Sequence, residues 1–278
     1  MRGDGPAIER LLAAHADVNE PRPDGATALH WAVYRNDLTT ARALVKAGAN
    51  VTLANEAGVA PLLLAAERGN PDMLALLLDA GAPVDSTLRN GETALMMATR
   101  TGNVPAIDVL AQHGADINAR EKLRGTTALM WAAAYRNADA ASALIGHGAN
   151  VALRANPIQR GRRPYLAPSG AERIDQAKRG VNVSGVSRPP PAGTKRATPP
   201  PDDEAPPPRN SGVADGGGLT ALIFAAREGD LATAKILLEH GADVNQTSEF
   251  GWTPLLTATQ NRFYQLGKFL LDHGADPN

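Results

Sequence analysis

The chain has 278 residues, of which 43% are hydrophobic and only 4% aromatic, so we expect a sizeable core of mainly aliphatic side chains. Its formal net charge of −1 excludes a global field that would steer it toward nucleic acid or a membrane. The absence of cysteine excludes disulfides and thiolate metal sites. No apolar run approaches the ~20 residues that a membrane-spanning helix needs.

Two short motifs recur along the sequence with a common period. The first, Ala-Asp-Val-Asn at residues 16–19, returns with small changes six times, and its third position recurs after 33, 33, 33, 34, 93 and 33 residues. The second motif, Gly-x-Thr-Ala/Pro-Leu, keeps the same phase. A fixed period of this length indicates a stack of structural repeats. The second motif occupies residues 25–29, 91–95, 125–129 and 251–255.

Each repeat is predicted to contain two short helices. Thr27 is expected to cap the first helix, in which Leu29 and Ala32 share one face, and Asn36-Asp37 form the turn. Leu44 points inward from the second helix, which ends at Gly48 because a left-handed residue is least strained as glycine. The following turn-rich segment leads to the next repeat.

These motifs resemble the ankyrin-repeat family, in which Gly-x-Thr-Pro/Ala-Leu begins a repeat and Gly-Ala-Asp/Asn-Val-Asn ends it. The resemblance covers about four-fifths of the chain and implies an all-α solenoid of stacked helix-turn-helix units with finger-like turns. It implies a protein partner without identifying one, because this fold carries many functions. One extra residue near Leu123-Arg124 lengthens one finger.

The repeats divide the chain into three predicted segments. Residues 1–155 comprise a half repeat and four full repeats, and residues 215–278 comprise two more. Residues 156–214 contain 12 prolines, with ten Lys/Arg against five Asp/Glu, and this composition predicts a disordered insertion. Because Met1 falls in the middle of a repeat, we expect a segment of a longer array. The compartment therefore stays open.

Four histidines immediately precede the glycine that ends a second helix. There an imidazole interacts favourably with the negative helix end, and no ligand-type spacing accompanies it, so we expect helix caps and no metal or other cofactor. They are His113, His147, His240 and His273. Three aromatic residues share another repeat position, where the family resemblance implies core packing, with a ligand-facing stack as the alternative. They are Trp31, Trp131 and Phe224.

The resemblance also selects the candidate binding residues, at the finger tips and at the exposed end of each first helix. Arginine and aromatic side chains there match the composition of interface hot spots. We predict no catalytic residue in the chain and therefore no enzyme activity. The candidates are Asp24, Tyr34, Arg35, Glu67, Arg68, Arg89, Arg100, Arg124, Tyr135, Arg227, Glu228, Phe250, Trp252 and Gln260.

The leading functional hypothesis is a monomeric scaffold that binds a protein partner through its concave face and finger tips. A second is binding of nucleic acid or an anionic surface by the basic insertion, although no series of aromatic residues accompanies its charges, so nucleic acid is not the expected partner. A third is that the array targets or regulates an enzyme whose catalytic domain lies outside this segment.

Overall fold

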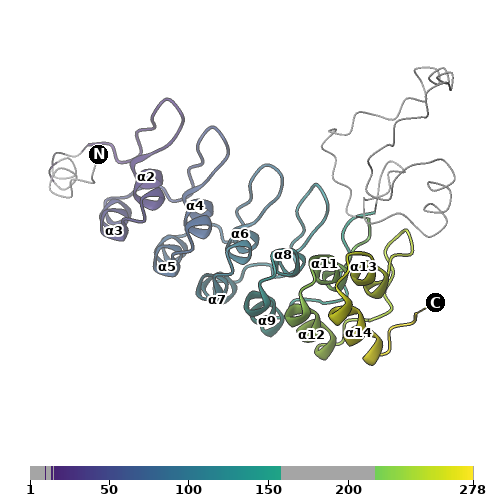
Figure 1. Ribbon diagram of the computed structural model, residues 1–278. Helices are drawn as coiled ribbons and strands as arrows, with labels where there is room; N and C mark the ends of the chain where they lie inside the picture. Colours follow the sequence, from purple (N-terminus) through teal and green to yellow (C-terminus); the bar gives the residue numbers. More distant parts are fainter. Residues whose placement is uncertain (1–9, 11–13, 15, 158–216, 278) are drawn as a thin grey trace, which may run out of the picture.

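A computed structural model describes residues 16–157 and 217–277, together with Arg10 and Ala14. Twelve helices in these residues form six antiparallel pairs, and consecutive pairs pack side by side along an arc (Figure 1). The predicted all-α solenoid is confirmed. The first helices of the pairs are α2 (Ala28–Tyr34), α4 (Pro61–Arg68), α6 (Ala94–Arg100), α8 (Ala128–Ala134), α11 (Ala221–Glu228) and α13 (Pro254–Gln260). The second helices are α3 (Leu38–Lys46), α5 (Pro71–Asp79), α7 (Val104–Gln112), α9 (Ala138–Gly146), α12 (Leu231–Glu239) and α14 (Tyr264–Asp272).

Local sequence explains where the first helices begin. The hydroxyls of four threonines each accept the backbone N–H three residues later, which satisfies an otherwise unpaired donor at the helix start. They are Thr93, Thr127, Thr220 and Thr253. Thr27 differs, because its N–H donates to Nδ1 of His30 and its hydroxyl lies 2.9 Å from the same nitrogen. Pro61 and Pro254 stand at the first helical position, where no N–H is needed.

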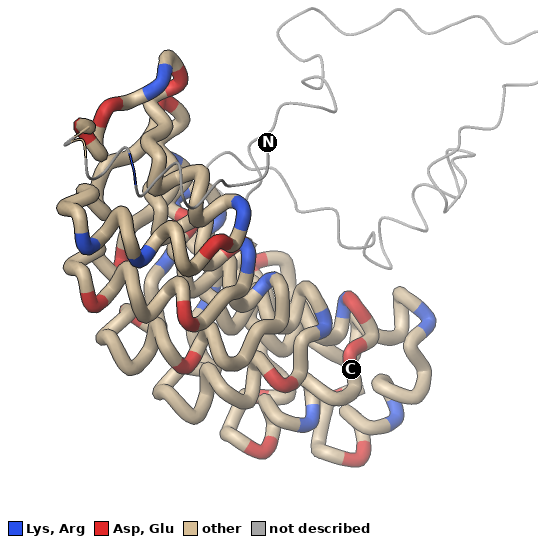
Figure 2. Tube along the Cα trace, turned by 90° about the vertical axis from the view of Figure 1, so that its left-hand side faces the viewer, with Lys and Arg blue, Asp and Glu red and all other residues tan. Residues whose placement is uncertain are grey.

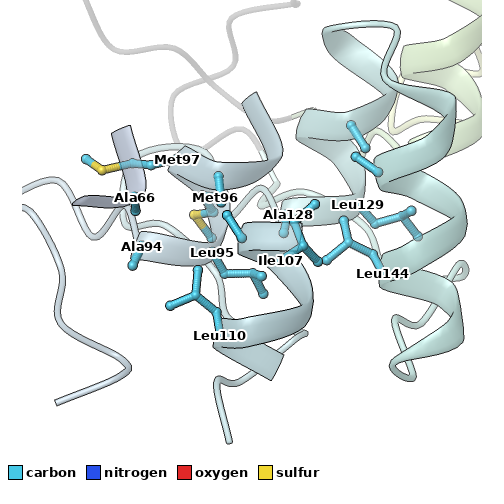
Figure 3. Close-up of a cluster of buried hydrophobic side chains, with 14 of the residues drawn as sticks. Ala66, Ala94, Leu95, Met96, Met97, Ile107, Leu110, Ala128, Leu129 and Leu144 are labelled. Carbon is cyan, nitrogen blue, oxygen red and sulfur yellow. The ribbon is translucent and has the colours of Figure 1, made fainter. Parts of the chain in front are cut away.

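The core lies between the two rows of helices and continues from one repeat to the next. Leu95 and Leu129 of the first row and Leu110 and Leu144 of the second are almost fully buried (Figure 3). Small residues such as Ala128 let neighbouring helices approach closely. Because each pair buries its apolar surface against its neighbours, stability depends on stacking.

The second helices end as the sequence predicts. All four predicted histidines are C-cap residues, and Nδ1 of His113, His240 and His273 lies 2.8 Å from the carbonyl oxygen four residues earlier. The glycine after each histidine has a positive φ of 84° to 93°, the conformation that favours this residue.

The turns between repeats form short hairpin fingers that hydrogen-bond to one another near their tips. Glu56 donates its N–H to the carbonyl of Asp24, and Lys122 donates to Asn90. In the same way, the backbone N–H of Asn156 donates to the carbonyl of Arg124, and that of Glu249 donates to the carbonyl of Gly217. The second and third fingers are joined instead by the Arg89 side chain, which donates to the carbonyl of Glu56, so the fingers form a continuous edge.

The finger before the fifth repeat is formed by residues on either side of 158–216, and these residues also pair with each other. Ala155 donates its N–H to the carbonyl of Leu219, and Arg154 forms an isolated antiparallel bridge with Thr220. Helices α8 and α11 pack against each other as the first helices of consecutive repeats. In the sequence, 86 residues lie between the end of α8 at Ala134 and the start of α11 at Ala221. The predicted insertion, except Asn156 and Pro157, lies outside the described residues. So do residues 1–9, 11–13 and 15, in the predicted half repeat, and the last residue.

Candidate functional site

The first helices and the fingers line the inner side of the arc, and the second helices form the outer row (Figure 1). None of the fourteen candidate residues is buried. Eight are exposed: Asp24, Tyr34, Arg35, Glu67, Arg68, Arg89, Arg124 and Tyr135. Six are half-buried: Arg100, Arg227, Glu228, Phe250, Trp252 and Gln260.

A cleft of about 390 Å³ lies on the inner side between the third and fifth repeats. Its wall includes four predicted residues, namely Arg100, Arg124, Tyr135 and Arg227. Eight further residues complete it, and two of them, Trp131 and Phe224, had been predicted to pack in the core with a ligand-facing stack as the alternative. The eight are Glu92, Glu121, Leu123, Thr126, Met130, Trp131, Ala134 and Phe224.

A buried carboxylate supports one side of this cleft. Glu121 is only 5% exposed, and its oxygens accept the backbone N–H groups of Leu123, Arg124 and Thr126 at 2.6–3.0 Å. The Thr126 hydroxyl also donates to Glu121 and accepts the indole N–H of Trp131, both at 2.9 Å. Glu121 therefore fixes the longer finger and, through Thr126, the position of the Trp131 ring.

The core prediction for the three equivalent aromatic residues needs correction. It holds for Phe224, which is 5% exposed, but Trp31 is 37% exposed and Trp131 is half-buried in the cleft wall. Trp31 lies in the first described helix, and its ring contacts Tyr34 and the guanidinium of Arg22. The repeat period shows that these three residues occupy equivalent positions. It does not show how deeply each side chain is buried by its own finger and neighbouring repeat.

The remaining candidates are grouped less closely. The Arg68 guanidinium lies 4.2 Å from the ring centre of Tyr34, which joins the first two repeats. Arg89 donates to the carbonyl of Glu56 at 2.6 Å, and Asp24 accepts the N–H of Ala26, so both have structural roles in fingers. Phe250, Trp252 and Gln260 belong to the last repeat and do not line the cleft.

The described residues contain no cluster of three His, Asp or Glu side chains that could hold a metal ion. Among the same residues, no helix is long and apolar enough to cross a membrane.

Comparison with protein families agrees with the repeat geometry. A family model described as "Ankyrin repeats (3 copies)" matches residues 1–87, 62–155 and 206–278. The chain belongs to the ankyrin repeat family. Ankyrin repeats generally mediate protein–protein interactions, which suggests a protein partner for this array.

Proposed function

We propose that this ankyrin array is a scaffold that binds a protein partner through its inner face, with the cleft around Trp131 and Tyr135 as its principal contact. The observation that carries this proposal is the clustering of Trp131, Tyr135 and three arginines around one cleft, with every one of these side chains exposed or half-buried. The arginines come from three consecutive repeats. Such side chains contribute strongly to binding because they bury a large area and form directed polar contacts.

The cleft is also supported by structure that exists before any partner binds. Trp131 is held by Thr126 and Glu121, and its ring centre lies 6.1 Å from that of Tyr135. A surface whose side chains are already ordered loses less conformational entropy on association. The fixed ring therefore favours this part of the inner face as a binding surface.

The proposal can be tested by affinity capture from the source cell's lysate with three forms of the chain. The first is intact, the second carries Arg124→Ser and Tyr135→Ser, and the third carries Arg42→Ser and Lys46→Ser on exposed positions of the outer helix α3. We expect a partner held by the first and third forms to be lost from the second. Retention of every partner by the second form would reject the inner face as the binding surface.

A fourth form separates the array from the sequence between its described parts. Removing residues 158–216 joins Pro157 to Gly217, leaving a finger as long as the one at residues 121–126. A partner that this form still captures is bound by the ankyrin repeats. A partner lost only from this form is bound through residues 158–216.

A further inference from the structure

The cleft between the third and fifth repeats is called the Trp131 cleft from here on. Its two carboxylates, Glu92 and Glu121, already accept hydrogen bonds within the protein. The Glu121 carboxylate accepts three backbone N–H groups and one hydroxyl, and it is buried. Glu92 accepts a hydrogen bond of 2.7 Å from the side-chain amide of Asn90. Glu121 is therefore not available to a cationic ligand, and Glu92 shares the cleft wall with three arginines, so cations outnumber carboxylates there.

The cationic groups of the cleft are less fully engaged. Arg124 is exposed, and its side chain has no hydrogen bond or ion pair with the residues that the structure describes. Arg100 lies 3.9 Å from the Glu67 carboxylate, beyond direct hydrogen-bond distance. In contrast, Arg227 bonds to Glu228 at 2.8 Å and covers the ring of Phe224. Arg124 and Arg100 are thus the two cations best placed to bind an incoming anion.

The charge of the surrounding helices favours the same kind of ligand. The first helices and the one or two residues after each carry six arginines and two glutamates, counted as far as positions 36, 69, 102, 136, 229 and 262. The second helices with their caps and following turns carry four cations and twelve acidic residues. Figure 2 shows both signs distributed along the array. The inner row therefore attracts an anionic segment that the outer row repels.

The apolar wall of the cleft fits a side chain of a peptide better than an enclosed small molecule. Tyr135 is 53% exposed and Leu123 is 60% exposed, and both stand at the rim beside the half-buried Trp131. Sites for small molecules usually enclose about 70–90% of the ligand surface. An open cleft of about 390 Å³ instead accommodates one or two large side chains from a segment lying across it.

We propose that the Trp131 cleft binds an extended segment of a partner protein in which a large apolar side chain is flanked by carboxylates. The apolar side chain packs against Trp131, Tyr135 and Leu123. Arg124 and Arg100 donate hydrogen bonds to the flanking carboxylates. This inference rests on the proposed function and adds to it the chemistry of the segment that is bound.

The test uses the full chain carrying Trp31→Phe and Trp252→Phe, so that fluorescence reports only Trp131. The probes are acetylated and amidated Gly/Ser peptides of one length, with a central Phe flanked on both sides by Asp, Ser or Lys. We expect the Asp peptide to bind about tenfold more tightly than the Ser peptide, because charge-assisted hydrogen bonds add to the same apolar contact. The Lys peptide should bind more weakly than the Ser peptide.

Two variants assign this preference to the cleft. Adding Arg124→Ala and Arg100→Ala should reduce the affinity for the Asp peptide to that for the Ser peptide, whereas Arg42→Ala, at an exposed position of the outer helix α3, should leave the difference unchanged. Circular dichroism should show the same helix content in every form. Higher salt should reduce the advantage of the Asp peptide.

Equal affinities for the three peptides, a preference for Lys, or an Asp preference that survives loss of both arginines would overturn the inference. It would also be overturned if peptides bound only after removal of residues 158–216, because that segment would then be the occupant of the cleft. If capture depends on Tyr135 and Arg124 but the peptides show no charge preference, the scaffold function stands and this inference alone fails.

Discussion

Trp31 and Trp131 occupy the same position of the repeat, one in the first described helix pair and the other in the fourth. Trp31 is 37% exposed and contacts Tyr34 and Arg22. Trp131 donates to Thr126, which is held by the buried Glu121, and it shares a cleft with Phe224 of the next repeat. The comparison shows that the finger and the neighbouring repeat decide whether this residue forms part of a binding surface.

Removal of the buried carboxylate should have the largest effect on this difference. Glu121→Ala leaves three backbone N–H groups and the Thr126 hydroxyl without their acceptor, so we expect the free energy of unfolding to fall by about 2–3 kcal/mol. Urea unfolding followed by circular dichroism measures this. Glu56→Ala, on an exposed finger position, should change the value by less than about 0.5 kcal/mol. Equal effects of the two variants would show that the Glu121 network does not stabilise the finger.

Truncation of the two tryptophans compares their packing directly. Trp131→Ala should cost about 2 kcal/mol, because it removes contacts with two repeats and the bond to Thr126. Trp31→Ala should cost about half as much, since more of its ring already contacts water. Unfolding midpoints of both variants against the parent chain measure the difference. A larger loss for Trp31→Ala would contradict the contrast drawn between the sites.

The turn after the first helix of each pair allows a comparison of the same two repeats in which a smaller change in stability is expected. Asn36 and Arg136 occupy equivalent positions and both have φ of 58°. The last repeat has Arg262 there, with φ of 66°, and the other three have Gly69, Gly102 and Gly229. Arg136→Gly should raise stability by about 0.5–1 kcal/mol by relieving this conformation. Asn36→Gly should bring no gain, because Asn36 tolerates the conformation and accepts a hydrogen bond from Asn70. Thermal melts of both variants, compared with the parent, distinguish these outcomes.

The smallest expected effects are two pH dependences of opposite sign, the first of which arises from His30 in the first repeat. Burial lowers the pKa of His30 below its usual 6.5, against weaker opposing effects of the Val59 carbonyl and Asp24. The unfolded chain therefore binds this proton more readily, and stability should fall as pH drops below about 6.5. The fourth repeat has Met130 at this position. His30→Met should reduce the loss of stability between pH 7 and pH 5, measured by urea unfolding.

His113 provides a control of opposite sign. Hydrogen bonding to the Val109 carbonyl and then to Asp79 raises the pKa of His113. Its stabilising contribution is present below pH 6.5 and is lost as pH rises through its folded-state pKa. His113→Gln should therefore lower stability more at pH 5 than at pH 8. The same change at both values would contradict the assigned cause.

The repeat architecture could be predicted from local signals in the sequence, namely the 33-residue period, the capping threonines and the glycine after each second helix. The sequence also indicated that the candidate residues would not be buried, since the end of each first helix has a fixed place in every repeat. The extra residue near Leu123 was visible too, although its consequence was not.

Contacts between different repeats determine which of these residues share the cleft, and the sequence does not show those contacts. Glu121 is indistinguishable in sequence from an exposed finger glutamate, and its burial depends on the longer turn that folds its N–H groups toward the carboxylate. The pairing of Ala155 with Leu219 brings Phe224 into the wall of the same cleft as Trp131, although 92 residues lie between these two aromatic residues in the chain. Periodicity fixes a residue's place within its own repeat, whereas a cleft depends on contacts between side chains of different repeats and fingers.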